Sequence, residues 1–224
     1  PRAKSLKTFW SEMTPRLKRI VELLPVSDEL FDVGCDHGIV GVSALLLNKT
    51  QKTVFTDVSR KSLEKARRLA ESKGVLYKSE FLCGDGFCGR RAHTAVIAGM
   101  GGLEISKILG QASRLPDKLV LQPMRGVPEL REKLSKNYFF HVDEIFFDGK
   151  FYYLIYAERG SDNLTELEIK YGKTNLRQKT VDFHNFLFEE TVKCDKILAD
   201  GNHVPRVEER KAELDFLLSD WSTK

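Results

Sequence analysis

The stretch Asp32-Val33-Gly34-Cys35-Asp36-His37-Gly38 is the part of the sequence that best predicts the fold. It begins within a short apolar strand, Leu30–Gly34, and leads into a helical run, Ile39–Leu47. Glycines at such a junction let the chain turn tightly and bring backbone N–H groups close to a ligand. We therefore expect the first strand–helix unit of an open α/β sheet, with a ligand at the turn. A tight turn without a ligand is the alternative interpretation.

Short apolar strands alternate with helices on both sides of this stretch. The pattern predicts a helix that starts at Thr14-Pro15, helices at Ser59–Lys73, Leu103–Gln111 and Val127–Asn137, and strands at Thr53–Val58, Leu76–Cys83, Thr94–Ala98, Lys118–Gln122, Phe139–Phe147 and Phe151–Ala157. The last two strands flank Asp148-Gly149-Lys150, which is a hairpin signal. We expect a mostly parallel sheet covered on both faces, with a terminal antiparallel hairpin. This layout is typical of Rossmann-like methyltransferases, whereas a dehydrogenase more often keeps its sheet parallel to the end.

Length and composition fit one α/β domain with a small appendage. The chain has 224 residues, of which 42% are hydrophobic and 30% charged, so a largely disordered chain is excluded. We expect residues 1–160 to form the α/β domain with a basic N-terminal helix. Residues 161–224 are expected to form a coiled-coil-like helical hairpin: one long helix up to Leu198, a turn at Ala199–Pro205 and a second helix.

Several functional classes are disfavoured by the sequence. No apolar run approaches the roughly 18 residues of a membrane helix, and no signal-peptide core follows the basic N-terminus, so we expect a cytoplasmic protein without membrane contact. The four cysteines form no C-x-x-C pair and the five histidines are scattered, so we expect no metal. The oligomeric state is expected to be a monomer, with a dimer as the alternative.

Further motifs follow the other predicted strands, whose carboxyl ends meet at one edge of an open sheet. Asp57 could accept both ribose hydroxyls of an adenosine cofactor, or cap the next helix. Gly84-Asp85-Gly86 could place Asp85 at an adenine amine, or be an ordinary turn. The glycine loop Ile97–Gly102 would let a flat base approach closely, or only start a helix. Gln122-Pro123-Met124 offers an amide for a base edge, or simply ends a strand.

Taken together, these motifs resemble the bacterial tRNA adenine-N1 methyltransferases of the TrmK family, which modify adenine 22 in the D-arm. The resemblance covers about residues 14–160. It rests on Arg16-Leu17, Asp32–His37, Gly84–Phe87, Ile97–Gly102, Leu119–Met124 with Leu130-Arg131, and the hairpin residues Gly149–Tyr152. Met124 replaces the usual Asn of the family. The C-terminal helices resemble the coiled-coil appendage of the family only loosely.

The resemblance implies S-adenosylmethionine as cofactor and tRNA as substrate. Asp36 is the expected catalytic residue, which would accept a proton from the adenine or stabilise its charge. The expected cofactor-binding residues are Asp32, Gly34, His37, Gly38, Asp57, Val58, Asp85, Gly86, Ala98, Gly99, Met100 and Gly101. The expected substrate-binding residues are Arg16, Lys18, Arg19, Gly102, Gln122 and Pro123.

Charge is compatible with an RNA partner without requiring one. Residues 1–160 carry 26 Lys and Arg against 19 Asp and Glu, and residues 161–224 carry 10 against 13. Basic runs on the N-terminal helix and on the helix Ser59–Lys73 could meet phosphates, or be solvated helix faces. Other functions remain as alternatives: a methyltransferase that acts on another RNA position or on a small molecule, a non-catalytic RNA- or protein-binding module, and an NAD-dependent oxidoreductase.

Overall fold

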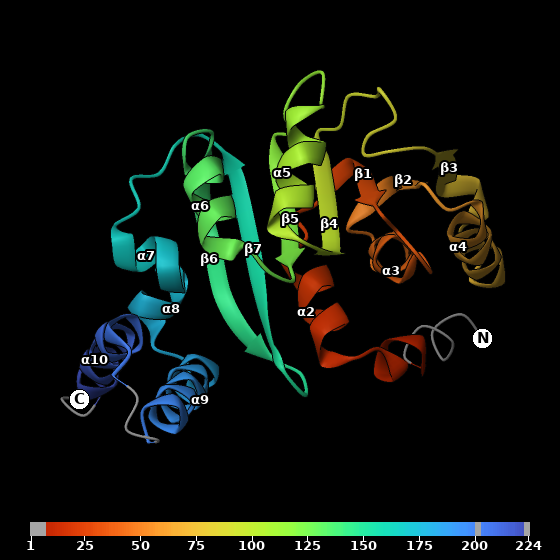
Figure 1. The fold of residues 1–224 in the computed structure, drawn as a ribbon. Coiled ribbons are helices and arrows are strands. Elements are labelled where there is room, and N and C mark those ends of the chain that lie inside the picture. Colours follow the sequence, from red (N-terminus) through yellow and green to blue (C-terminus); the bar gives the residue numbers. More distant parts are fainter. Residues whose placement is uncertain (1–7, 200–202, 222–224) are drawn as a thin grey trace.

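The computed structural model describes residues 8–199 and 203–221, and these form a seven-stranded sheet with helices on both faces (Figure 1). The strands are β1 (Ser27–Val33), β2 (Thr50–Asp57), β3 (Ser79–Cys83), β4 (Thr94–Met100), β5 (Lys118–Pro123), β6 (Tyr138–Phe147) and β7 (Phe151–Arg159). Their order in the sheet is β3-β2-β1-β4-β5-β7-β6. Strands β1 to β5 pair in parallel, and β7 is antiparallel to both β5 and β6. The predicted Rossmann-like fold with its terminal hairpin is confirmed.

The helices of this domain begin and end close to the predicted positions. They are α2 (Pro15–Leu23), α3 (Ile39–Leu46), α4 (Arg60–Ser72), α5 (Gly102–Gly110) and α6 (Val127–Ser135). Thr14 caps α2, since its side chain accepts a hydrogen bond from the Leu17 N–H, as the Thr-Pro pair predicts. The third strand is shorter than predicted because Leu76–Lys78 forms a 3-10 turn, and pairing with β2 starts only at Ser79.

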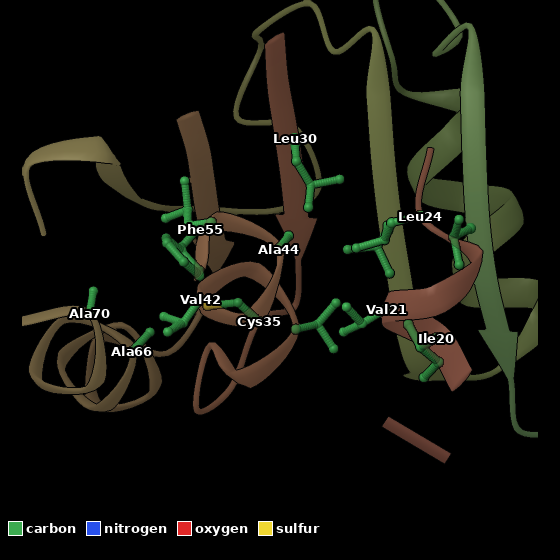
Figure 2. Close-up of a cluster of buried hydrophobic side chains, with 14 of the residues drawn as sticks. Ile20, Val21, Leu24, Leu30, Cys35, Val42, Ala44, Phe55, Ala66 and Ala70 are labelled. Atoms are coloured by element: carbon green, nitrogen blue, oxygen red, sulfur yellow. The ribbon is translucent and has the colours of Figure 1, made fainter. Parts of the chain in front are cut away.

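Both faces of the sheet are buried, which explains why its strands lack polar alternation. Leu30 and Phe55 point to the face covered by α2, α3 and α4, where they pack with Val21 and Ala66 (Figure 2). Phe31, the neighbour of Leu30, points to the other face and packs in the cluster that α5 and α6 cover. Successive side chains of a strand alternate between faces, so each strand supplies both cores.

The C-terminal region differs from the predicted hairpin in its first half. The expected long helix is three helices, α7 (Glu166–Tyr171), α8 (Lys173–Gln178) and α9 (Val181–Leu198), followed by α10 (Pro205–Ser219). The prediction of one continuous helix is wrong because Gly172 and Lys179 have positive φ angles, 90° and 49°, which end the helical path. A third apolar cluster, which includes Phe183, Leu187 and Leu214, joins α9 and α10 to the sheet edge at Ile145.

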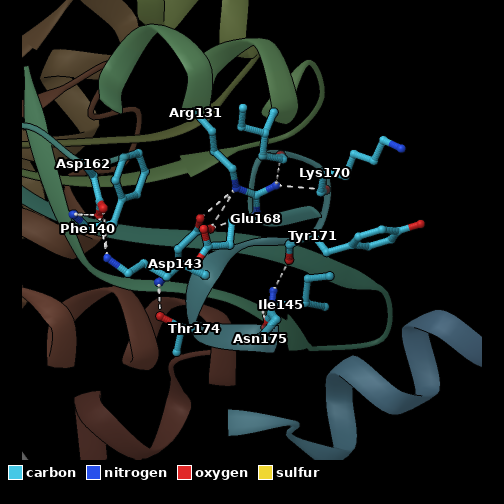
Figure 3. Close-up of polar contacts among 12 residues, drawn as sticks. Arg131, Phe140, Asp143, Ile145, Asp162, Glu168, Lys170, Tyr171, Thr174 and Asn175 are labelled. Carbon is cyan, nitrogen blue, oxygen red and sulfur yellow. Dashed lines mark hydrogen bonds and ion pairs between the residues drawn. The ribbon is translucent and has the colours of Figure 1, made fainter. Parts of the chain in front are cut away.

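The C-terminal helices are fastened along β6, the edge strand of the sheet. Four residues of this strand donate backbone N–H groups to side chains of the following segment: Phe140 to Asp162 (3.2 Å), Asp143 to Thr174 (2.8 Å), Ile145 to Asn175 (2.8 Å) and Phe147 to Asp182 (2.9 Å). Figure 3 shows the first three of these hydrogen bonds. An edge strand exposes such groups unless something covers them. The helices therefore hold a fixed position against the sheet. No helix of the described residues is long and apolar enough to cross a membrane.

Candidate functional site

A cavity of about 490 Å³ lies beyond the carboxyl ends of β1, β2, β3 and β4. It is the place where open α/β sheets bind ligands. The walls come from the start of α2 (Arg16, Leu17), the turn after β1 (residues 32–37 with Ile39 and Val40), the end of β2 (Asp57, Val58), the turn after β3 (residues 84–86), and the end of β4 with α5 (Ala98, Gly99, Met100, Glu104, Ile108).

The turn after β1 needs glycine and is pinned to β2. Gly34 has a φ of +66°, a conformation that residues with a side chain rarely adopt, and a Cβ at this position would also displace the end of the Met100 side chain, whose Cε would lie 2.0 Å away. The N–H groups of Gly34 and Cys35 both donate to the carbonyl of Thr56, at 2.8 and 3.1 Å. The backbone of the turn is therefore fixed against the cavity before any ligand arrives.

Asp32 is a buried carboxyl at the base of this turn. Its Oδ2 accepts a hydrogen bond of 2.9 Å from the N–H of Gly41 in α3. Burial, and to a lesser extent the charge of Asp57, raise the pKa of Asp32 to about 7, although the Gly41 hydrogen bond acts in the opposite direction. A cationic group placed in the cavity beside Asp32 would stabilise its ionised form.

Asp57 presents its carboxylate to the cavity from the end of β2. Its Oδ1 accepts from the Ser59 N–H at 2.8 Å, and its Oδ2 accepts from the Asp36 N–H at 3.1 Å. The N-cap of α4 is Ser59, whose hydroxyl accepts from the Ser62 N–H, so Asp57 is not the cap. Each carboxylate oxygen can accept a second hydrogen bond, which leaves Asp57 able to hold two hydroxyl groups.

Asp36 and His37 lie at the mouth of the cavity in a small cluster of charges. The Asp36 side chain is 66% exposed; its Oδ1 lies 3.6 Å from Nζ of Lys65 and its Oδ2 lies 3.6 Å from Nε2 of His37. Lys65 Nζ also lies 3.2 Å from the same His37 nitrogen. Exposed ion pairs of this kind contribute little stability, so Asp36 can exchange these partners for a substrate group.

Arg16 lines the cavity instead of pointing to the outer surface of α2. Its backbone N–H donates to Oδ2 of Asp148 at 3.1 Å, its Nη1 donates to Oε1 of Gln122 at 2.7 Å, and its guanidinium lies 5.0 Å from the ring centre of Tyr152. Gln122 is completely buried and does not line the cavity. Its Nε2 is directed to the sulfur of Met124 at 3.1 Å. Gln122 therefore reaches the cavity only through Arg16.

The two other basic residues predicted on α2 do not face the cavity. Arg19 forms a bidentate pair with Glu144, with distances of 2.6 and 3.1 Å, and this hydrogen bonding raises the pKa of Arg19. Lys18 donates to the carbonyl of Ser11 at 3.3 Å. Arg19 thus fastens α2 to the hairpin strand β6.

The glycine loop after β4 is bound to the turn after β5. The Gly102 N–H donates to the carbonyl of Arg125, and the Met124 N–H donates to the carbonyl of Met100, both at 2.8 Å. A Cβ on Gly102 would lie 2.2 Å from the carbonyl oxygen of Gly126, so only glycine fits. The predicted site residue Gly102 does not line the cavity, and neither do Gly38, Gly101 and Pro123.

The cavity brings together Asp36 and most of the predicted cofactor residues. These are Asp32, Gly34, His37, Asp57, Val58, Asp85, Gly86, Ala98, Gly99 and Met100. Sequence reasoning missed Glu104 and the apolar wall of Leu17, Ile39, Val40 and Ile108. Apolar lining residues carry no chemical signal in a sequence, and Glu104 resembles any acidic residue in the first turn of a helix. No group of three or more possible metal ligands occurs among residues 8–199 and 203–221.

Comparison with known proteins gives consistent matches. Residues 13–156 match the family described as "Methyltransferase domain". The tRNA (adenine(22)-N(1))-methyltransferase of Bacillus subtilis is 29% identical over 157 residues, which are 66% of each chain. A Mycoplasma pneumoniae protein named "Putative tRNA methyltransferase" is 32% identical over 133 residues, 57% of this chain and 61% of that one. The match thus spans less than two thirds of these curated relatives.

Among solved structures, TrmK of M. capricolum in complex with S-adenosyl-homocysteine has the same fold. Its TM-score is 0.79 at 22% sequence identity, and the match covers 93% of this chain and 97% of that one. The likeness includes the C-terminal helices as well as the sheet domain, because it extends over nearly all of both chains.

Proposed function

Because the chain belongs to the methyltransferase-domain family, we propose that it transfers a methyl group from S-adenosylmethionine to N1 of adenine 22 in tRNA. The observation that carries this proposal is the cavity, which gathers Asp32, Asp57 and Asp85 from the ends of three neighbouring strands around a glycine turn. The activity of the Bacillus subtilis relative and the ligand of the M. capricolum structure support it. A tRNA substrate implies a cytoplasmic location.

The chemistry of the lining residues fits the cofactor. Asp57 has acceptor sites on both carboxylate oxygens for the two ribose hydroxyls. Asp85 is exposed after β3 and can accept from the exocyclic amine of adenine. Asp32 has a raised pKa, and the ammonium group of the cofactor's amino-acid part would lower this pKa and stabilise the carboxylate. We assign the adenosine part to Asp57, Val58, Asp85 and Gly86, and the amino-acid part to the turn around Gly34 and to residues 98–100.

The acceptor base is proposed to enter at the mouth of the cavity. The bound cofactor supplies an electrophilic sulfonium methyl group. Adenine N1 already has a lone pair, so the protein contributes mainly alignment of N1 with that methyl group. Forming the N1–methyl bond and breaking the methyl–sulfur bond leaves a cationic ring, which becomes neutral when N6 loses a proton. Asp36 is placed to accept this proton, directly or through one water.

Arg16 is proposed to contact the base, with Gln122 as its positioning residue. The guanidinium is planar, always charged and held over the Tyr152 ring, so it can stack on a base or donate to its edge. Adenine N1 is hidden while the base is paired or stacked, and taking the base out of its stack costs about a few kcal/mol. Stacking or hydrogen bonding of the base with Arg16, whose position is already fixed, would offset part of that cost.

The test is the variant Asp36→Ala, assayed with an unmodified tRNA transcript. We expect turnover to fall by about two to four orders of magnitude, as for the loss of a general base. Binding of S-adenosylmethionine, measured by calorimetry, should stay within a factor of about two, since Asp57 and Asp85 are unchanged. Asp28→Ala, at an exposed position at the start of β1 and so at the end of the strand away from the cavity, is the matched control. Normal turnover of Asp36→Ala would remove Asp36 from the reaction.

A further inference from the structure

We infer that a cleft between the sheet domain and the C-terminal helices binds a nucleotide of the RNA that flanks the methylated adenine. This inference rests on the proposed function, because it takes the substrate to be an RNA. Two adjoining hollows form the cleft, and Lys170 and Arg210 line both: one of about 260 Å³ lies between the sheet domain and the C-terminal helices, and one of about 420 Å³ continues it between α7 and α10. The first hollow extends from the turn after β5, at Met124 and Arg125, to Tyr153 of β7.

Tyr153 provides a fixed aromatic wall. Its ring lies between the guanidinium of Arg131, 5.6 Å from the ring centre, and the ring of Phe186, at 6.2 Å and 76°. Within the described ranges the Tyr153 hydroxyl has no hydrogen-bond partner, and the residue is half-buried. Burial also raises the pKa of Tyr153, so the hydroxyl stays protonated and can donate. A ring held in this way, with an unused donor, suits a ribose or a base edge.

The support behind Tyr153 is rigid because Arg131 is itself immobilised. Arg131 is completely buried and forms a bidentate pair with Asp143, with distances of 2.8 to 3.1 Å. Its Nη1 donates to the carbonyls of Ile169 and Lys170 at the end of α7, each at 3.1 Å (Figure 3). One side chain thus connects α6, β6 and α7. The two walls of the cleft cannot move apart without breaking the two hydrogen bonds that a buried guanidinium donates to α7.

The cleft is lined by an excess of cations. The two hollows are lined by Arg125, Lys170, Arg206 and Arg210 against Glu209 and Glu213. Lys170 pairs with Glu213 at 2.6 Å, and Arg210 pairs with Glu190 at 2.8 Å. Arg125 and Arg206 form no ion pair in the part of the chain that the structure describes. Unpaired arginines at the two ends of a cleft suit a backbone phosphate.

The cleft also lies next to the cofactor cavity. Met124 lines the cleft and Met100 lines the cavity, and the N–H of the first donates to the carbonyl of the second at 2.8 Å. The Arg125 side chain lies over the glycine loop, since a Cβ on Gly101 would be 3.4 Å from its Nε. The cleft and the cofactor cavity are therefore separated by the glycine loop after β4 and the turn after β5.

An unstacked nucleotide is the occupant that these groups favour. Proteins recognise unpaired RNA by combining aromatic or arginine planes for the bases with cations for the backbone. Removing the target adenine from its stack exposes its neighbours at the same time. The cleft would then hold the strand on one side of the adenine while the cavity holds the adenine itself.

The experiment measures binding of an unmodified tRNA transcript to the full chain by filter retention at several salt concentrations. Arg125→Ala should weaken binding about fivefold or more and reduce the salt slope by about one, as expected for one lost phosphate contact. Tyr153→Phe, which removes only the hydroxyl, should weaken binding about threefold with an unchanged slope. The matched control is Arg91→Ala, an exposed arginine in the loop before β4, at the amino end of the parallel strands and so away from the cleft, and its binding should change less than about twofold.

If Arg125→Ala and Tyr153→Phe bind the transcript as tightly as Arg91→Ala, the cleft does not hold RNA and the inference is wrong. A wild-type protein that binds no tRNA would overturn it as well. A wild-type protein that binds tRNA, loses that binding with Arg125→Ala, and yet transfers no methyl group would support the cleft while contradicting the proposed function.

Discussion

The ionisation of Asp32 should affect both the pH dependence of stability and the affinity for the cofactor. The variant Asp32→Asn, which cannot ionise, should change both. The pKa of Asp32 is raised to about 7 in the folded chain, against about 3.9 in an unfolded one. Because the folded value is the higher one, the folded state binds the proton more tightly. The stability associated with the protonated carboxyl is fully present below about pH 4 and is lost as the pH rises through about 7.

The size of the change in unfolding free energy follows from the pKa shift of Asp32. About three pKa units correspond to about 4 kcal/mol in total, of which about 2–3 kcal/mol should be lost between pH 5 and pH 8. Asparagine keeps an oxygen that can accept the Gly41 N–H but cannot ionise. The unfolding free energy of Asp32→Asn should therefore gain about 2–3 kcal/mol over the wild type between pH 5 and pH 8.

Urea unfolding of the ligand-free protein at several pH values measures this difference. With a slope of about 2–3 kcal/mol per molar urea, the wild-type midpoint should fall by roughly 1 M relative to the variant. The control Asp28→Asn, at an exposed carboxylate of the same strand, should follow the wild type. Affinity for S-adenosylmethionine should fall about 10- to 100-fold in Asp32→Asn, as for the loss of a charged hydrogen bond. Parallel pH profiles of wild type and Asp32→Asn would refute the reasoning.

Two more predictions concern the groups that hold the site. Gln122→Ala removes the side-chain oxygen that accepts the 2.7 Å hydrogen bond from Arg16. Turnover with tRNA should fall about tenfold, while the dissociation constant of S-adenosylmethionine should not change. Equal losses of turnover and cofactor affinity would mean that Gln122 supports the whole cavity. Arg131→Met leaves the Asp143 carboxylate buried without its partner and should cost about 3–5 kcal/mol in urea unfolding. Arg131→Met combined with Asp143→Leu should recover more than half of that loss, and no recovery would contradict the role of the ion pair.

The fold of the α/β domain could be predicted because each signal was local. Short apolar strands, the Thr14-Pro15 cap and the Asp148-Gly149-Lys150 turn are each recognised within a few residues, and all of them are present, although β3 begins three residues later than expected. The break of the C-terminal helix could not be predicted in this way. Helices α7, α8 and α9 all present apolar residues to the edge of the sheet, so the helical spacing continues across the breaks at Gly172 and Lys179.

Site residues that directly follow the parallel strands could be predicted from the sequence, whereas those on helix α2 could be predicted only in part. Asp32, Asp57 and Asp85 line one cavity because parallel strands end at the same edge. Arg16 and Arg19 were grouped as phosphate contacts on charge alone, yet one faces the cavity and the other pairs with Glu144. Their difference depends on how α2 packs against a hairpin more than 100 residues away, which no local pattern contains.

The most direct test of the proposed function uses methyl-labelled S-adenosylmethionine with two tRNA transcripts, one unmodified and one with guanine in place of adenine 22. Label should enter the first transcript as 1-methyladenosine, and none should enter the second. Label in both transcripts would contradict the position, and label in neither would contradict tRNA as the substrate.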